Sequence, residues 1–302
     1  MYASERLKGI DVFVATVAAG SFTAAADRLN LTSSATGKAV ARLEARLQTR
    51  LFERTTRRLR LTDAGAAFHR VCLRVLDELE SAERVLAADG LEPVGRLRLD
   101  LPTTFGHLMV MPLLVQFIRR HPGLRPHVSF TDRFVDVIDE GIDVAVRIGG
   151  GDSWPVNLGQ RYLGTERLIF CASPGYLDSH GTPQSVADLN AHATVTYGRA
   201  DGTASPWLMV TAKGPPERRV IESRIVVGHG QAQLDAVAAG LGVAQLATWL
   251  ARQHLADGRL LPILAHLDTD GLPLHLVWPV SKQLLPKVDG LLRHLGESLH
   301  AR

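Results

Sequence analysis

Hydroxyl, small and basic side chains share one side of the segment 32–47, and this arrangement is suited to contacting DNA. At about 100° per residue, the other side of a helix here carries Thr36, Val40, Leu43 and Leu47, which can only be core. A major groove admits a helix that starts with short side chains and continues with cations, which reach base edges or phosphates. We therefore predict DNA contacts from Thr32, Ser33, Ser34, Gly37, Lys38 and Arg42.

A shorter helix is predicted immediately upstream, over about 22–29, with Asn30 and Leu31 in the turn between the two helices. Leu31 is expected to fill the gap between them, and Thr32 or Ser33 to cap the second helix through its hydroxyl group. Two short helices joined in this way form a helix-turn-helix. An ordinary amphipathic helix pair remains the alternative.

A basic hairpin is expected to follow the second helix. Short extended runs at 51–54 and 59–61 flank a polar segment and would form a two-stranded wing. We predict that Arg54, Arg57 and Arg58 contact a phosphate backbone or a minor groove. A solvated basic loop is the alternative.

Charge and composition bound the class of protein. The chain has 302 residues, which suggests two or three domains. Residues 1–62 hold eleven Lys or Arg and five Asp or Glu, a net charge of +6 within a total of +3, which leaves −3 for the rest. The two cysteines, Cys72 and Cys171, lie far apart, so neither a disulfide nor a zinc site is expected. The chain shows no signal region and no run of 18 apolar residues. We expect a cytoplasmic, soluble protein that does not interact with membranes.

The segment from Thr62 to about Ala88 is predicted to form one long helix, because it lacks proline and its only glycine lies in the first turn. Apolar side chains recur on one face with coiled-coil spacing: Phe68, Val71, Val75, Leu79, Ala82 and Leu86. Such a seam needs a partner. We favour the same helix of a second copy, which would bring two reading helices to one DNA; packing against the chain's own body is the alternative.

The body of the chain reads as an α/β domain with a largely parallel sheet. We predict strands at 96–101, 126–130, 143–148, 168–172, 194–197, 224–227 and 243–246. We predict helices at 105–120, 134–140, 231–239 and 283–300. Breaks near 163–167 and 265–272 indicate two lobes that exchange strands, about 93–165 with 266–302, and 166–265.

Two strand-to-helix turns of this body are suited to holding a small carboxylate in a cleft between the lobes. Each places backbone N–H groups at a helix start beyond the end of a strand, where open α/β sheets bind ligands. The predicted ligand contacts are Thr103, Thr104, Phe105, Arg147, Gly149, Tyr197, Gly228 and His229. For some of these a simpler role stays open: a helix cap for the threonines, a surface ion pair for Arg147 and a turn for His229.

The common catalytic signatures are absent from the sequence. There is no G-x-S-x-G, no H-E-x-x-H and no phosphate-binding loop with a lysine, and the twelve histidines lack metal spacing. We expect no catalytic residues, metal or cofactor. A solute-binding module without specific DNA function and an α/β enzyme are the alternatives to a DNA-binding regulator.

Several motifs together resemble the LysR-type transcriptional regulators along essentially the whole chain. The resemblance is carried by Phe-Val-Ala at 13–15, Gly-Ser-Phe-Thr-Ala-Ala-Ala at 20–26, Arg-Leu-Glu at 42–44, Leu-Phe-Glu-Arg-Thr at 51–55, Leu-Thr-Asp-Ala-Gly at 61–65, and the segments 130–136, 141–149 and 168–177. The matching run 32–38 departs from the family's frequent reading helix by having Ser33 for an amide side chain and Gly37 for serine.

This resemblance implies a fold, a domain order and a set of partners. The expected order is a winged helix-turn-helix over 1–62, a dimerising linker helix over 63–92, and an effector domain of two lobes, like a periplasmic binding protein, over 93–302. The implied partners are double-stranded promoter DNA, a small-molecule inducer that is often an organic acid, and one or three further copies in a homodimer or homotetramer. RNA polymerase is a further candidate partner.

Overall fold

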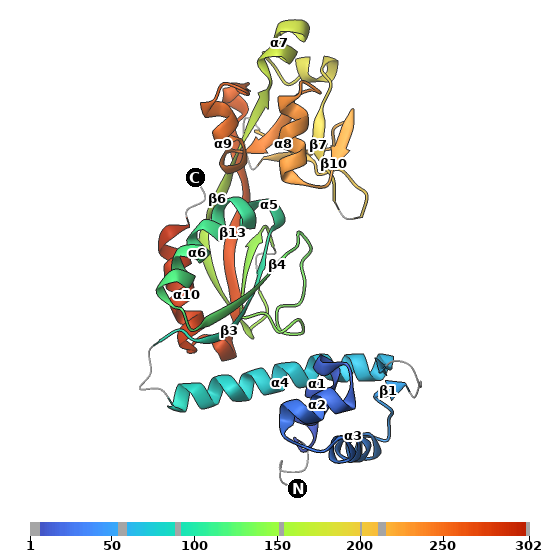
Figure 1. Ribbon diagram of the computed structural model, residues 1–302. Coiled ribbons are helices and arrows are strands. Elements are labelled where there is room, and N and C mark those ends of the chain that lie inside the picture. Colours follow the sequence, from blue (N-terminus) through green and yellow to red (C-terminus); the bar gives the residue numbers. More distant parts are fainter. Residues whose placement is uncertain are drawn as a thin grey trace. The chain divides into compact units, whose positions relative to one another are not determined.

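The computed structural model shows two compact units, Met1–Gly90 and Leu91–Arg302, which are described separately (Figure 1). The structure describes residues 7–53, 59–87, 92–150, 154–199, 201–210 and 216–299, and within 77–87 the side chains of Leu79 and Glu83 only. Among these residues, no helix combines the length and apolar character needed to cross a membrane.

The first unit begins with three helices, α1 (Ile10–Ala19), α2 (Phe22–Leu29) and α3 (Ser33–Leu47). Ser21 caps α2 by accepting a hydrogen bond from the backbone N–H of Ala24, and Thr32 caps α3 by accepting one from Ala35, each at 3.1 Å. Asn30 ends α2 in the left-handed conformation (φ 53°), which turns the chain sharply between the two helices. The predicted helix-turn-helix is therefore confirmed.

The core of this unit is built around Phe13. Its buried ring contacts those of Phe52, Phe68 and His69, with centroids 5.5, 5.7 and 5.9 Å away. The predicted inner side of α3 is confirmed, since Thr36, Val40 and Leu43 are buried and Leu47 packs partly against the core. The role expected for Leu31 is wrong: its side chain is 43% exposed, whereas Ala25 and Ala26 of α2 are buried.

A short hairpin and a long helix complete the first unit. Strand β1 (Phe52–Glu53) pairs antiparallel with β2 (Arg60–Leu61), which confirms the two strands of the wing. Arg54, Arg57 and Arg58 lie outside the described residues. Helix α4 (Asp63–Ala87) begins after Thr62, whose hydroxyl group accepts a hydrogen bond from the N–H of Gly65 at 2.9 Å. On its seam, Val71 and Leu79 are 42% and 40% exposed, whereas Phe68 packs against the core of this unit.

The second unit is organised on a mixed sheet with strand order β11-β6-β13-β5-β3-β4, with β12 also paired to β6. Its strands are β3 (Gly95–Leu101), β4 (Leu124–Phe130), β5 (Val144–Ile148), β6 (Leu158–Ala172), β11 (Ala244–Ala247), β12 (Leu261–Ile263) and β13 (Thr269–Pro279). Within this sheet, β3 pairs in parallel with β4 and β5, and all pairs made by β6 and β13 are antiparallel. The prediction of a largely parallel sheet is therefore wrong.

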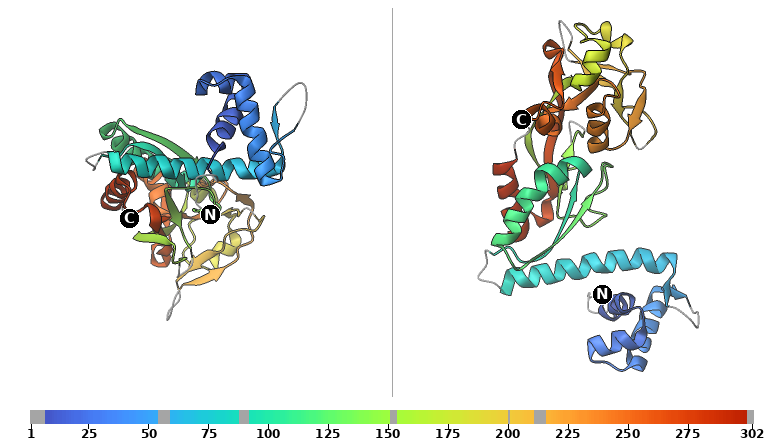
Figure 2. Two further views of the ribbon diagram at one scale, coloured as in Figure 1. Left: turned by 90° about the horizontal axis from the view of Figure 1, so that it is seen from below. Right: turned by 45° about the horizontal axis from the view of Figure 1, so that its top comes forward.

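Two strands, β6 and β13, run side by side from one lobe into the other (Figures 1 and 2). Lobe I, which contains β3, β4 and β5, packs helices α6 (Met111–Arg120) and α10 (Pro286–Ser298) on one sheet face. These helices cover the buried side chains of Leu97, Leu99 and Leu101. Lobe II, which contains β11 and β12, packs α8 (Gly230–Ala238) and α9 (Thr248–Ala256) on β6 and β11. Cys171 and Leu246 lie in its core.

Shorter elements fill the rest of the second unit. They are α5 (Thr103–Phe105), a π-helical turn (Gly106–Val110), α7 (Pro174–His180), β7 (Val195–Tyr197), β8 (Trp207–Met209), β9 (Glu217–Arg219), β10 (Ile225–Val227), and 3-10 turns at Asp188–Ala191, Ala265–Leu267 and Val280–Lys282. The helix predicted at 134–140 is wrong. The Asp136 carboxylate there accepts hydrogen bonds from the backbone N–H groups of Ile138 and Asp139 at 2.8 and 2.9 Å, which favours a turn.

Two glycines of the first unit should respond in opposite ways to the same substitution. Outside its own helix backbone, no heavy atom lies within 4 Å of a Cβ placed at Gly37, whereas a Cβ at Gly65 would overlap the backbone oxygen of Leu51. Gly37→Ala should stabilise the protein by about 0.5–1 kcal/mol, because alanine restricts the unfolded chain. Gly65→Ala should destabilise it by about 1–3 kcal/mol through overpacking.

Urea unfolding of the two variants, followed by circular dichroism, checks the opposite signs. Equal effects of the two substitutions would contradict the packing of α4 against Leu51.

Candidate functional site

The outer side of α3 presents the predicted DNA-contacting residues to solvent. Ser33, Ser34, Lys38 and Arg42 are exposed, and Gly37 adds no side chain between them. The Arg42 Nε donates to the backbone oxygen of Lys38 at 3.3 Å, so the two cations lie one helical turn apart on the same side. Thr32 differs from the others because its hydroxyl group already caps the helix.

Glu44, in the last turn of α3, fixes the start of the wing to this helix. Its Oε1 accepts hydrogen bonds from the backbone N–H groups of Leu51 and Phe52, at 2.7 and 3.1 Å. The first wing strand therefore begins at a defined place beside the reading helix. The Arg-Leu-Glu motif at 42–44 thus combines an exposed cation, a core leucine and this anchor.

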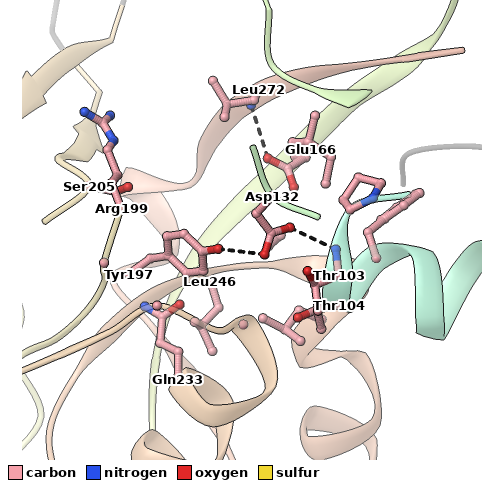
Figure 3. Close-up of a pocket in the computed structure, with 18 of the residues that line it drawn as sticks. Thr103, Thr104, Asp132, Glu166, Tyr197, Arg199, Ser205, Gln233, Leu246 and Leu272 are labelled. Atoms are coloured by element: carbon pink, nitrogen blue, oxygen red, sulfur yellow. Dashed lines mark hydrogen bonds between the residues drawn. The ribbon is translucent and has the colours of Figure 1, made fainter. Parts of the chain in front are cut away.

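A pocket of about 830 Å³ lies between the lobes of the second unit (Figure 3). Six predicted ligand residues line it: Thr103, Thr104, Phe105, Arg147, Tyr197 and Gly228. Gly149 and His229 do not line it. The Gly149 N–H donates to the backbone oxygen of Pro273 at 2.7 Å, and the His229 Nδ1 caps α8 by accepting a hydrogen bond from Ala232.

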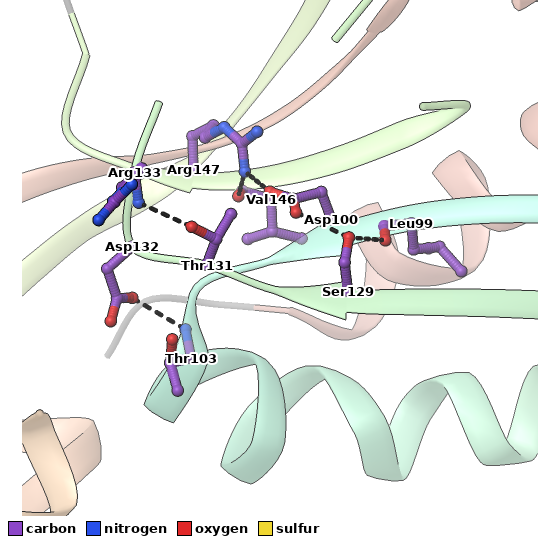
Figure 4. A network of polar contacts seen from close by, with 9 residues as sticks. All are labelled: Leu99, Asp100, Thr103, Ser129, Thr131, Asp132, Arg133, Val146 and Arg147. Carbon is purple, nitrogen blue, oxygen red and sulfur yellow. Dashed lines mark hydrogen bonds and ion pairs between the residues drawn. The ribbon is translucent and has the colours of Figure 1, made fainter. Parts of the chain in front are cut away.

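Arg147 is the buried cation of the pocket wall, with only 3% of its surface exposed. Its Nη1 donates to Asp100 Oδ1 at 2.5 Å, and Ser129 donates to the same carboxylate at 2.8 Å (Figure 4). Its Nη2 is buried and has no hydrogen-bond partner among the described protein atoms. The ring of Phe134 lies 5.9 Å from the guanidinium carbon. A surface ion pair for Arg147 is therefore excluded, because both Arg147 and Asp100 are buried.

Asp132 bridges the two lobes across the pocket (Figure 3). Its Oδ1 accepts a hydrogen bond from the N–H of Thr103 in lobe I at 2.9 Å, and its Oδ2 accepts one from the hydroxyl group of Tyr197 in lobe II at 3.2 Å. Burial, together with the nearby charge of Asp132 and this hydrogen bond, raises the pKa of Tyr197 to about 12. Tyr197 therefore acts as a neutral donor at physiological pH.

Glu166 is a buried carboxyl group of the pocket that the sequence did not reveal. It lies on β6, where its Oε1 accepts from the indole N–H of Trp249 at 2.9 Å and its Oε2 accepts from the N–H of Leu272 at 3.4 Å. Burial raises the pKa of Glu166, and the two hydrogen bonds oppose that change. Trp249 in turn packs edge-on against Phe105, with centroids 5.0 Å apart, and so connects both lobes.

Neither Asp132 nor Glu166 was predicted as a site residue: Asp132 lies in the segment 130–136 of the family resemblance among other acids, and Glu166 is an isolated acid on a strand. Among the described residues, no group of three or more His, Cys, Asp or Glu is arranged to hold a metal ion.

A winged helix-turn-helix joined to an α/β domain with two lobes and a pocket between them defines a class of DNA-binding regulators. The family model described as the bacterial regulatory helix-turn-helix protein, lysR family, matches residues 7–66, and the LysR substrate binding domain matches 91–300. The chain therefore belongs to the LysR family and is a DNA-binding transcriptional regulator with a substrate-binding domain.

Similar proteins share this domain order over nearly their whole length. An uncharacterized HTH-type transcriptional regulator of Haemophilus influenzae is 33% identical over 95% of this chain and 98% of its own. The regulator CrgA of Neisseria meningitidis is 32% identical over 96% of this chain and 97% of its own. The solved structure of CrgA matches with a TM-score of 0.61 at 31% identity, covering 96% of this chain and 97% of that one.

The raised pKa of Glu166 predicts how the stability of a neutral variant depends on pH. The folded protein keeps this proton to a higher pH than the unfolded chain, whose Glu166 has the ordinary pKa of 4.5. The wild type therefore loses stability relative to Glu166→Gln as pH rises from 4.5 to the raised pKa of the folded protein. Thermal unfolding of both proteins across this range should show a gap that widens in favour of the variant. A gap that stays constant with pH would contradict the burial of an ionisable carboxyl group here.

Proposed function

We propose that the chain controls transcription in response to a small organic acid bound between the lobes. The observation that carries this proposal is the unpartnered, buried Nη2 of Arg147 on the pocket wall. A buried guanidinium with free N–H groups favours a carboxylate, because a charge-assisted hydrogen bond compensates for the loss of hydration.

The charge of the pocket lining also favours an acid. Four arginines line it, Arg133, Arg147, Arg199 and Arg218, against the two carboxyl groups of Asp132 and Glu166. Three of these arginines are exposed, so they attract anions at the entrance without being desolvated themselves. Aromatic side chains, including Phe105, Trp207 and Trp249, supply an apolar wall for the body of the ligand.

In the proposed complex, one Nη of Arg147 stays with Asp100 while the other binds the carboxylate of the acid. Asp100 keeps the guanidinium in place and neutralises its charge before the ligand arrives. Thr103, Thr104 and Tyr197 form the polar wall beside it. Gly228 has no side chain and so leaves room for the ligand near the start of α8. Phe105 contributes its ring.

The proposed DNA contact is made by the exposed side of α3. Ser33, Ser34 and Gly37 allow close approach, and Lys38 and Arg42 contact bases or phosphates. Arg54, Arg57 and Arg58 are proposed to extend the contact through the wing. The exposed seam of α4 is proposed to pair with that of a second copy, in a homodimer or homotetramer, so that two reading helices bind one promoter.

Removing one cation from the reading helix should reduce DNA binding without unfolding the protein. Lys38→Ala and Arg42→Ala should each lower the affinity for sheared DNA of the host, and the salt slope should fall by about 0.9 for each phosphate that is no longer neutralised. Arg70→Ala, an exposed cation on α4, is the matched control and should change little. Fluorescence anisotropy at several salt concentrations measures both quantities; unchanged affinity of both α3 variants would contradict the assigned face.

Replacing Arg147 with a lysine, which lacks the second Nη, should weaken the binding of acids. Arg147→Lys keeps a charge opposite Asp100 but loses the second Nη, so affinity should fall about 10- to 100-fold, as expected for one charge-assisted hydrogen bond. Thermal-shift screening of small carboxylic acids, followed by calorimetry, measures this change. The same substitution at Arg293, which is exposed on α10 and does not line the pocket, is the control. Equal acid affinity in wild type and Arg147→Lys would refute the assigned anchor.

A further inference from the structure

Glu166 is an unusual residue to find in the wall of a pocket for acids. Its side chain is 7% exposed, and no described lysine, arginine or histidine forms an ion pair with it. Its only hydrogen bonds among the described residues come from two neutral donors, the indole of Trp249 at 2.9 Å and the N–H of Leu272 at 3.4 Å. A carboxylate has about four lone-pair sites, so acceptor capacity remains.

The fold does not require an ionisable group at this position. A glutamine would accept the hydrogen bond from Trp249 through its amide oxygen and would give up only the longer one from Leu272 at 3.4 Å, without the cost of burying an ionisable group. The neighbouring Arg167 does not compensate the charge either, since it lies near Asp268 and Asp270 instead. Unpaired buried ionisable groups that line a cleft are candidates for contact with a ligand.

Glu166 and Arg147 lie on opposite sides of the same strand. Strand β13 is hydrogen-bonded to β5 on one side and to β6 on the other. Arg147 pairs with His275 of β13, whereas Glu166 contacts Leu272, three residues away along that strand. Two strand spacings and three residues separate their backbones by roughly 14 Å. The pocket therefore has a cationic donor, Arg147, and a carboxyl acceptor, Glu166, on different strands of its wall; Figure 3 shows Glu166.

We propose that the pocket selects an organic acid that carries a hydrogen-bond donor, a hydroxyl or an ammonium group, distal to its carboxylate. Arg147 Nη2 receives the carboxylate and Glu166 accepts from the distal donor. Because their backbones lie on different strands and the two groups form no ion pair with each other, the donor is placed on a different part of the ligand from its carboxylate. This inference rests on the proposed function and adds the class of acid to it.

The test uses the full-length protein and matched acids that differ only at the far end. The probes are butanoate, hexanoate and octanoate, each beside its ω-hydroxy and ω-amino counterpart, and cyclohexanecarboxylate with the same groups at its fourth carbon. In calorimetry, at least one donor-bearing acid should bind the wild type about tenfold or more tightly than its unsubstituted partner. An advantage confined to the amino or to the hydroxy series identifies the donor.

The Glu166→Gln variant tests whether the carboxyl group of Glu166 binds the ligand or only holds Trp249 in place. It keeps an acceptor for Trp249 and replaces the other oxygen with a donor, so the ratio of the affinities for the donor-bearing and the unsubstituted acid should fall towards one. Trp249→Phe is the structural control, because it removes the indole donor and leaves the carboxyl group. This variant should preserve the preference, even where overall affinity falls.

Four outcomes overturn the inference. Donor-bearing and unsubstituted acids could bind the wild type equally, or the preference could persist undiminished in Glu166→Gln; either result leaves the proposed function intact. If no acid binds, or if Arg147→Lys binds every acid as the wild type does, the proposed function itself fails, and this inference fails with it.

Discussion

The pairing of β6 with β13 is the constraint on which the second unit depends. Their register runs from Leu158 opposite Pro279 to Leu168 opposite Thr269, with shifts near Asp270–Pro273 and Leu274–His275. Each strand therefore belongs to both lobes, and the irregular part of the pairing lies beside the pocket. Bulges bend and twist the strands that contain them, so we expect any change in the closure of the lobes to act at this place. Arg147 and Glu166 are both attached to it, one through β5 and one on β6 itself.

Contacts between the lobes hold the degree of closure seen in this structure. In this structure Asp132 accepts hydrogen bonds from both lobes, and Trp249 packs on Phe105 while donating to Glu166. A ligand shifts an equilibrium only by the difference in its affinity for the two states. An acid held by Arg147 on lobe I that also contacts lobe II would favour one degree of closure. Helix α4 connects this unit to α3 along the chain. A second copy paired along α4 would therefore be affected by a change in the closure of the lobes.

Much of the first unit could be predicted from the sequence, because its signals are local. Caps at Ser21 and Thr32, the 3.6-residue period of α3 and the basic hairpin depend on residues close together in the chain. The second unit was harder, because β6 and β13 are half-exposed strands interrupted by Gly164, Gly271 and Pro273, and their partners are remote. Arg147 could be proposed from its position at the end of a strand. Asp132 and Glu166 could not, since their roles arise only when distant elements meet.

The central claim is that this protein reads specific DNA through α3 as a paired regulator, and genome-wide mapping of its binding sites tests that claim most directly. Purified full-length protein would be bound to sheared DNA of its host, and the recovered fragments sequenced. We expect a limited set of sharp sites with approximate two-fold symmetry, because two copies present two reading helices. Diffuse binding that follows only salt concentration and fragment length, without a shared sequence, would contradict the claim.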